Sequence, residues 1–146
     1  MLFLLAGTVT TAALFITDAF FAFAGWRILV KKQTGGRASV VRGYARMERH
    51  EPTLAAVAMT AAAALAIRAG FTHVPGMCLA GSAFVAIGAH LLLHLKTVCL
   101  MQRFEEAPVC SAEWHTRAAK LEAVMLTRAS LQGAAFICLL AAGSLS

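Results

Sequence analysis

Charged residues are scarce in this sequence, and their scarcity decides the class of protein. Only 14% of the 146 residues are Asp, Glu, Lys or Arg, whereas 60% are hydrophobic and the mean hydropathy is +0.73. A soluble globular domain has about 25% charged residues. The composition therefore excludes an ordinary soluble domain and predicts a single transmembrane domain over residues 1–146.

The chain also lacks the motifs of several other classes. Its four cysteines, Cys78, Cys99, Cys110 and Cys138, form no C-x-x-C pair and no zinc-finger spacing, so we expect small buried apolar side chains. The first apolar run has no basic segment before it and is too long for the apolar part of a secretory signal. We therefore expect this run to be retained as a membrane span.

Acidic residues are fewer than basic ones, 7 against 13, which gives a formal net charge of +6. The basic residues nevertheless lie between the apolar runs, and a cluster of them falls in the loop 31–51. Basic loops of membrane proteins face the cytoplasm. The charge therefore predicts membrane topology, with a lipid bilayer and no nucleic acid as the partner.

Four apolar runs are long enough to span a bilayer, which takes about 20 residues of α-helix. They cover residues 2–30, 52–70, 76–101 and 113–142. Because the basic loop 31–51 is cytoplasmic, both termini are expected on the outer side. The predicted fold is all-α, an integral membrane four-helix bundle with up-down-up-down topology, and the short loops favour a bacterial inner membrane.

Four ionisable side chains fall at similar depth in these spans, and they are the candidate catalytic residues: Asp18, His90, His94 and Arg128. A lone charge near the bilayer centre costs about 2.5–3.5 kcal/mol on insertion scales, so we expect Asp18 to pair with Arg128. The two histidines are four residues apart and share one helix face. We expect that face to point into the protein, because imidazoles in hydrocarbon would lack hydrogen-bond partners.

Several chemistries fit this cluster. His90 and His94 could both ligate one metal ion, with a carboxylate from Asp18 or Glu122. One histidine could instead be an axial haem ligand. Without a cofactor, a histidine base and Arg128 could stabilise a phenolate or enolate in a lipophilic pocket. Purely structural roles also fit: an ion pair that fixes helix register, and histidines bonded to hydroxyl or backbone oxygens.

Small residues predict where the helices approach one another. Thr11, Asp18 and Gly25 recur every seven residues and share a protein-facing stripe. The second span is mostly alanine and is expected to be a packing helix. Gly81 and Gly88 lie on a different face from the two histidines, and we expect them to seat a neighbouring helix.

Three stretches of the chain resemble a known family. Phe20–Phe23 places Phe-Phe-Ala-Phe in the first span, and Trp114, Leu121 and Arg128 follow at intervals of seven in the fourth. Thr97–Met101 stands where the family has Asn-Val-Pro-Leu-Asn. On these residues the chain resembles the small four-helix membrane proteins that include anthrone oxygenases. The resemblance implies an oxygenase or oxidoreductase with a lipophilic, aromatic substrate.

Two other families resemble parts of the chain. Met47–Arg49, His94 and Glu122 are similar to landmarks of the small membrane protoporphyrinogen oxidase, and residues 42–52 resemble the Arg…Pro segment of the MAPEG glutathione-dependent enzymes. The sequence thus favours a membrane oxidoreductase that acts on a lipophilic small molecule at the buried cluster. The alternatives are a non-catalytic accessory subunit and a haem- or metal-binding subunit, packed against partner membrane subunits or in a homo-oligomer.

Overall fold

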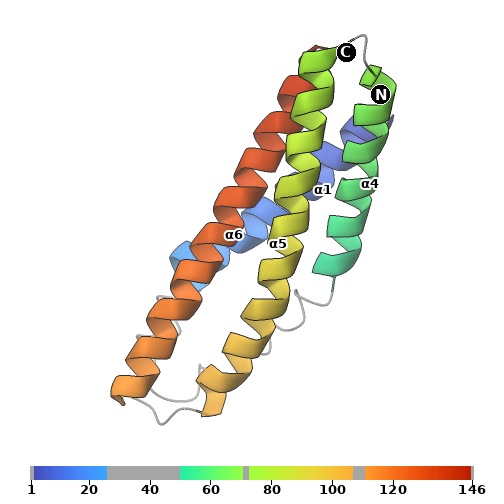
Figure 1. Cartoon of the computed structure of the whole chain (residues 1–146). Helices are drawn as coiled ribbons and strands as arrows, with labels where there is room; N and C mark the ends of the chain where they lie inside the picture. Colours follow the sequence, from blue (N-terminus) through green and yellow to red (C-terminus); the bar gives the residue numbers. More distant parts are fainter. Residues whose placement is uncertain (1, 26–49, 71–72, 107–110, 146) are drawn as a thin grey trace.

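Four long helices pack as a bundle in the computed structural model, which describes residues 2–25, 50–70, 73–106 and 111–145 (Figure 1). Each is long and apolar enough to cross a membrane, which confirms the all-α bundle of membrane-length helices. A π-helical stretch, η1 (Phe21–Gly25), continues the first helix directly after Phe20. The four helices are α1 (Leu2–Phe20), α4 (Glu51–Ala69), α5 (Val74–Glu106) and α6 (Ala112–Ser144).

Helices that follow one another in the chain lie side by side, and α6 closes the ring against α1. The start of α1 and the end of α6 meet at one end of the bundle, where Gly143 lies against Leu4. We call this the terminal end. The opposite, hairpin end is formed by α5 and α6, which extend beyond α1 and α4 (Figure 1).

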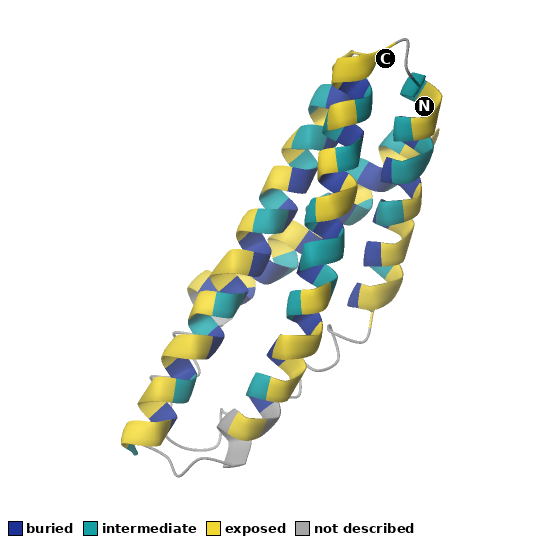
Figure 2. Ribbon diagram, viewed as in Figure 1, coloured by how far each residue is buried: buried dark blue, intermediate teal, exposed yellow. Residues whose placement is uncertain are grey.

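The buried residues of every helix recur at alternating steps of three and four, the heptad spacing of antiparallel bundles. Figure 2 shows that the buried positions line the inside and the exposed positions face outward. Large apolar side chains on the outside, such as Val85 and Leu92, suit contact with lipid. The longest stripe of buried residues is on α6 and consists of Trp114, Ala118, Leu121, Met125, Arg128, Gln132, Ala135, Leu139 and Ala142.

Two apolar clusters fill the interior, with charged residues between them. The cluster toward the terminal end is built mostly of alanines together with Leu14, Ile87 and Leu139. The cluster toward the hairpin end contains larger side chains, among them Trp114 and Met125. On each helix the heptad stripe continues through the charged residues, so one bundle geometry positions both the apolar and the charged side chains.

The glycines that allow close helix contact are not the ones expected from the sequence. A Cβ on Gly7 would lie 3.1 Å from Cβ of Ala61, so α1 and α4 approach closely there. A Cβ on Gly81 would meet no described atom within 4 Å, and Gly88 faces only the tip of Met59 at 3.9 Å. Gly81 instead lines a shallow outward groove between α5 and α6, so its predicted role is wrong.

Helix boundaries differ from the predicted spans mainly at the hairpin end, where α5 continues to Glu106. Residues 26–49 lie outside the described residues, and they include the end of the first predicted span and most of the basic loop. The last residue assigned to that loop, Glu51, is the first residue of α4 and is buried. Its placement adds a buried carboxylate to the helix that was expected to serve only for packing.

Candidate functional site

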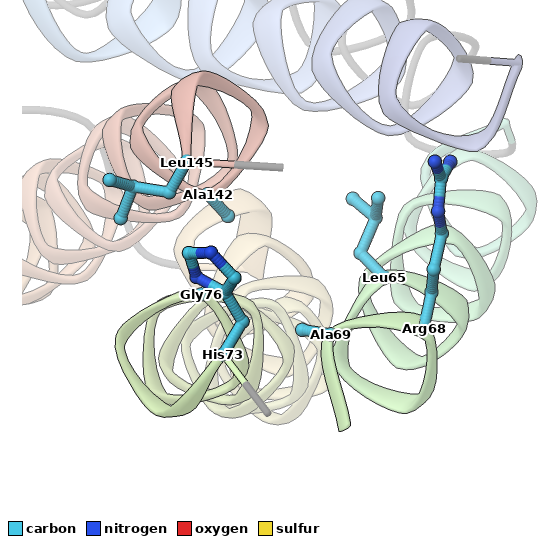
Figure 3. A pocket seen from close by; sticks show the side chains of 7 residues that line it. All are labelled: Leu65, Arg68, Ala69, His73, Gly76, Ala142 and Leu145. Carbon is cyan, nitrogen blue, oxygen red and sulfur yellow. The ribbon is translucent and has the colours of Figure 1, made fainter. Parts of the chain in front are cut away.

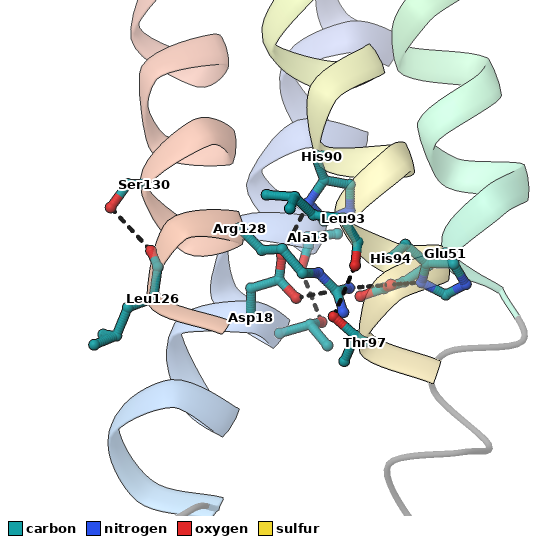
Figure 4. Close-up of polar contacts among 11 residues, drawn as sticks. Ala13, Asp18, Glu51, His90, Leu93, His94, Thr97, Leu126, Arg128 and Ser130 are labelled. Carbon is teal, nitrogen blue, oxygen red and sulfur yellow. Dashed lines mark hydrogen bonds and ion pairs between the residues drawn. The ribbon is translucent and has the colours of Figure 1, made fainter. Parts of the chain in front are cut away.

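Five ionisable side chains from all four helices meet in the interior, between the two apolar clusters (Figure 4). Each is at most 6% exposed. We call this group the polar layer: Asp18 of α1, Glu51 of α4, His90 and His94 of α5, and Arg128 of α6. The four residues predicted from the sequence are therefore brought together, and Glu51 joins them.

Local sequence explains why each side chain points inward. Asp18 follows buried Leu14 by four residues, and Arg128 follows buried Met125 by three, so both continue a heptad stripe. Glu51 starts the stripe of α4, where Pro52 is tolerated because the first helical turn needs no intrahelical N–H partner. A carboxylate in that first turn also interacts favourably with the helix dipole.

Glu51 is held by two donors that share one of its oxygens. Nδ1 of His94 lies 2.6 Å from Oε2 of Glu51 in a hydrogen bond. Nη2 of Arg128 donates to the same oxygen. The side chains of all three residues are buried. The other oxygen, Oε1, is buried and has no hydrogen-bond partner among the described residues.

Asp18 has a different arrangement. Nη2 of Arg128 lies 3.1 Å from Oδ1, which confirms the predicted pairing of Asp18 with Arg128. Nδ1 of His90 lies 3.2 Å from Oδ2, yet neither atom makes a hydrogen bond within the described part of the chain. The two atoms are therefore close without the alignment that an N–H···O bond requires.

Three of these residues are arranged as a set of metal ligands would be. One carboxylate oxygen each of Asp18 and Glu51 and one ring nitrogen of His90 all lie within 4.8 Å of one another. Two atoms bound to one ion at about 2.1 Å would be about 3.0–3.4 Å apart, which matches the 3.2 Å between His90 and Asp18. The expected second histidine, His94, is bonded to Glu51 instead, and half-buried Glu122 is outside the group.

The polar layer has an unbalanced charge. Asp18 and Glu51 contribute two negative charges and Arg128 one positive charge, which leaves one negative charge when both imidazoles are neutral. An uncompensated charge is strongly unfavourable in a low-dielectric interior. The layer therefore calls for one more positive charge, which a proton or a metal ion would supply.

One neutral polar residue adjoins the layer. Gln132 is fully buried on α6, one turn from Arg128 toward the terminal end, and neither of its amide atoms has a hydrogen bond to a described residue. His94 and Arg128 lie at one level because they share an oxygen of Glu51. Since α5 and α6 run in opposite directions, one turn toward the terminal end leads to His90 on α5 and Gln132 on α6.

Residues that carry the family resemblance also lie in the interior. Trp114, Leu121 and Arg128 belong to one buried stripe of α6, and Phe21 is buried beside them, whereas Phe20 and Phe23 are exposed. Comparison of the chain with protein families, curated proteins and solved structures finds no match.

Proposed function

We propose that the protein is a membrane-embedded metal-dependent oxidoreductase whose metal ion is bound by Asp18, Glu51 and His90. The observation that carries this proposal is the pair formed by Nδ1 of His90 and Oδ2 of Asp18. These atoms approach to 3.2 Å without a hydrogen bond, and Oε1 of Glu51 is likewise buried without one. One carboxylate oxygen of Glu51 forms a group of potential ligand atoms with Asp18 and His90. Convergent lone pairs of this kind suit a shared cation.

The donor set indicates the class of metal. Carboxylate and imidazole ligands suit iron, manganese and zinc, and a site with three protein ligands leaves coordination positions open. Bundles of four helices are a common host for such sites, with ligands that project inward from facing helices. The residual negative charge of the polar layer also favours a divalent ion.

The remaining polar residues act as outer partners of the ligands. His94 and Arg128 hold Glu51 through its second oxygen, which orients Oε1. Gln132 lies at the level of His90, and we propose that its Oε1 accepts a hydrogen bond from Nε2–H of the metal-bound ring, a bond that this structure does not contain. A ligating histidine usually donates its other N–H in this way, which fixes the tautomer with the lone pair on Nδ1.

The proposed activity follows from the metal and from its surroundings. An open-site redox metal flanked by apolar clusters suits oxidation of a lipophilic substrate, as the resemblance to anthrone oxygenases implies. Here the chain would supply the ligands and the apolar surroundings, while a bound metal would supply the redox chemistry. Arg128 contacts both carboxylates and would hold them in place as ligands.

Metal analysis of the purified protein tests this proposal. Protein in detergent is equilibrated with Fe²⁺, Mn²⁺ or Zn²⁺, freed of excess ion, and assayed for bound metal and for its absorption spectrum. We expect a single ion per chain in the wild type and none in His90→Ala, while the control His115→Ala, at an exposed position of α6, retains it. A folded wild type that binds none of the three ions would leave the polar layer as a proton-balanced ion-pair network.

The proposal includes the orientation in the membrane that the basic loop predicts. A reporter fused after Ser146 should be translocated, and one inserted at residues 35–36 should remain cytoplasmic. Reversed activities of the two reporters would overturn the orientation without affecting the metal site.

A further inference from the structure

A cavity of about 130 Å³ opens at the terminal end, between the ends of α4, α5 and α6 (Figure 3). Two basic side chains line it: Arg68, from the last turn of α4, and His73, just before α5. Its remaining wall is apolar and includes Leu65, Ala142 and Leu145. Basic and apolar side chains thus line the cavity together, with Arg68 and His73 on different parts of its wall, and it is far from the polar layer.

Within the part of the chain that the structure describes, no acidic side chain lies at this end of the bundle. Residues 1–17, 52–104 and 123–146 contain no Asp or Glu. Arg68 is 17 residues along α4 from Glu51, which corresponds to about 25 Å of helix. In the polar layer every basic group faces a carboxylate, whereas no acidic side chain among the described residues lies near the charge of Arg68.

We propose that this cavity binds a phosphate-type anion, supplied by the headgroup of a membrane phospholipid. Arg68 lies at the end of a membrane-length helix, the level at which headgroups are found. A guanidinium matches two phosphate oxygens at once, and the imidazole of His73 offers a further N–H. The apolar wall and the exposed Ile67 and Val74 beside it provide a surface for the acyl chains.

Native mass spectrometry of the full chain tests the proposal. The protein carries a C-terminal tag, so that Ser146 has no terminal carboxylate, and is purified with equal amounts of phosphatidylglycerol and phosphatidylcholine. We expect phosphatidylglycerol to be retained in preference, and Arg68→Gln to lower its retention at least about tenfold, as expected for loss of a charge-assisted hydrogen bond. His73→Gln should give a smaller loss.

The matched control is Lys120→Gln, which removes one positive charge from an exposed position near the hairpin end. Its lipid retention should equal that of the wild type, and Arg68→Lys should keep part of it if Arg68→Gln fails to fold. Addition of inorganic phosphate separates the two sources, since displacement of the lipid by millimolar phosphate would assign the cavity to the free ion. Equal retention of both lipids, or equal losses in Arg68→Gln and Lys120→Gln, would overturn the proposal.

Discussion

Two regions of the bundle are held together differently, the alanine-rich region toward the terminal end and the polar layer. Both are built on the same heptad stripes of the four helices. Toward the terminal end the stripe is mostly alanine, and helices approach closely, as at Gly7 and Ala61. In the polar layer the same positions hold charged side chains, and Arg128 contacts both Asp18 and Glu51. Burial depends on heptad position in both parts, but only in the polar layer does stability depend on charge balance.

A similar contrast exists within the polar layer. His90 and His94 share a helix face and are both buried, yet His94 makes a 2.6 Å hydrogen bond to Glu51 whereas His90 lies beside Asp18 without one. Spacing along α5 places both rings, but the neighbouring helices decide what each ring does. The predictions below use substitutions that separate charge balance, ligation and close packing.

Loss of Arg128 should have the largest effect, because it removes the cation that both buried carboxylates contact. We expect Arg128→Met to lower the free energy of unfolding by about 3–5 kcal/mol, measured by denaturant or thermal unfolding in detergent. The control Arg117→Met, which removes a partly exposed ion pair with Glu113 on the same helix, should cost at most about 1 kcal/mol.

Adding Asp18→Asn to Arg128→Met should restore part of the loss, since it removes one of the two stranded carboxylates. Glu51 would then keep its hydrogen bond to His94. Losses that simply add in the double variant would show that Asp18 and Arg128 are not energetically coupled.

The two histidines should respond differently to glutamine. Gln keeps an N–H donor but is a poor metal ligand, so His94→Gln should retain most of the metal affinity and His90→Gln should lose it. His94→Ala, which also removes the donor to Glu51, should weaken metal binding about 10–100-fold. Titration of the purified variants with Mn²⁺ or Zn²⁺ gives these affinities. Equal behaviour of the two Gln variants would contradict the separate roles of ligand and outer partner.

Gln132 offers a finer test of ligation. Gln132→Leu removes the acceptor assigned to His90 and should weaken metal binding about tenfold, whereas Gln132→Glu keeps an acceptor and should preserve binding. Ring nitrogen chemical shifts of His90, measured by ¹⁵N NMR, report its tautomer with or without metal. An unchanged His90 tautomer in Gln132→Leu would remove Gln132 from the site even if the fold is perturbed.

Much of this arrangement was predictable from the sequence, because depth in a span and helical spacing both follow from residue number. Asp18, His90, His94 and Arg128 were predicted on that basis, and the pairing of Asp18 with Arg128 is confirmed. Glu51 was missed because a charge next to basic loop residues is counted with the loop. The sequence shows Pro52 but not that α4 begins one residue before it.

Other features depend on how the helices are rotated against one another, which no single helix pattern contains. The ligand set joins three helices, so His90 rather than the His90–His94 pair lies with two carboxylates. The role of Gly81 was mispredicted for a similar reason. A glycine in the sequence indicates a helix face without a side chain, but not whether another helix packs against that face. A face that seats a helix and a face that lines an outward groove look alike in sequence.

The smallest expected effect comes from the glycines and tests the alanine-rich part of the bundle. Gly81→Ala places a methyl group in open space and removes a flexible residue from a helix interior, so it should stabilise the protein by roughly 0.5–1 kcal/mol.

Gly7→Ala makes the same change of residue, but its Cβ would lie 3.1 Å from Cβ of Ala61, an atom fixed to the backbone of α4. The helices must then separate slightly, which should offset that gain and leave Gly7→Ala less stable than Gly81→Ala by about 1 kcal/mol. Thermal unfolding of both variants in one detergent measures the difference. Equal melting temperatures would show that α1 and α4 accommodate the added methyl group at Gly7 without a cost in stability.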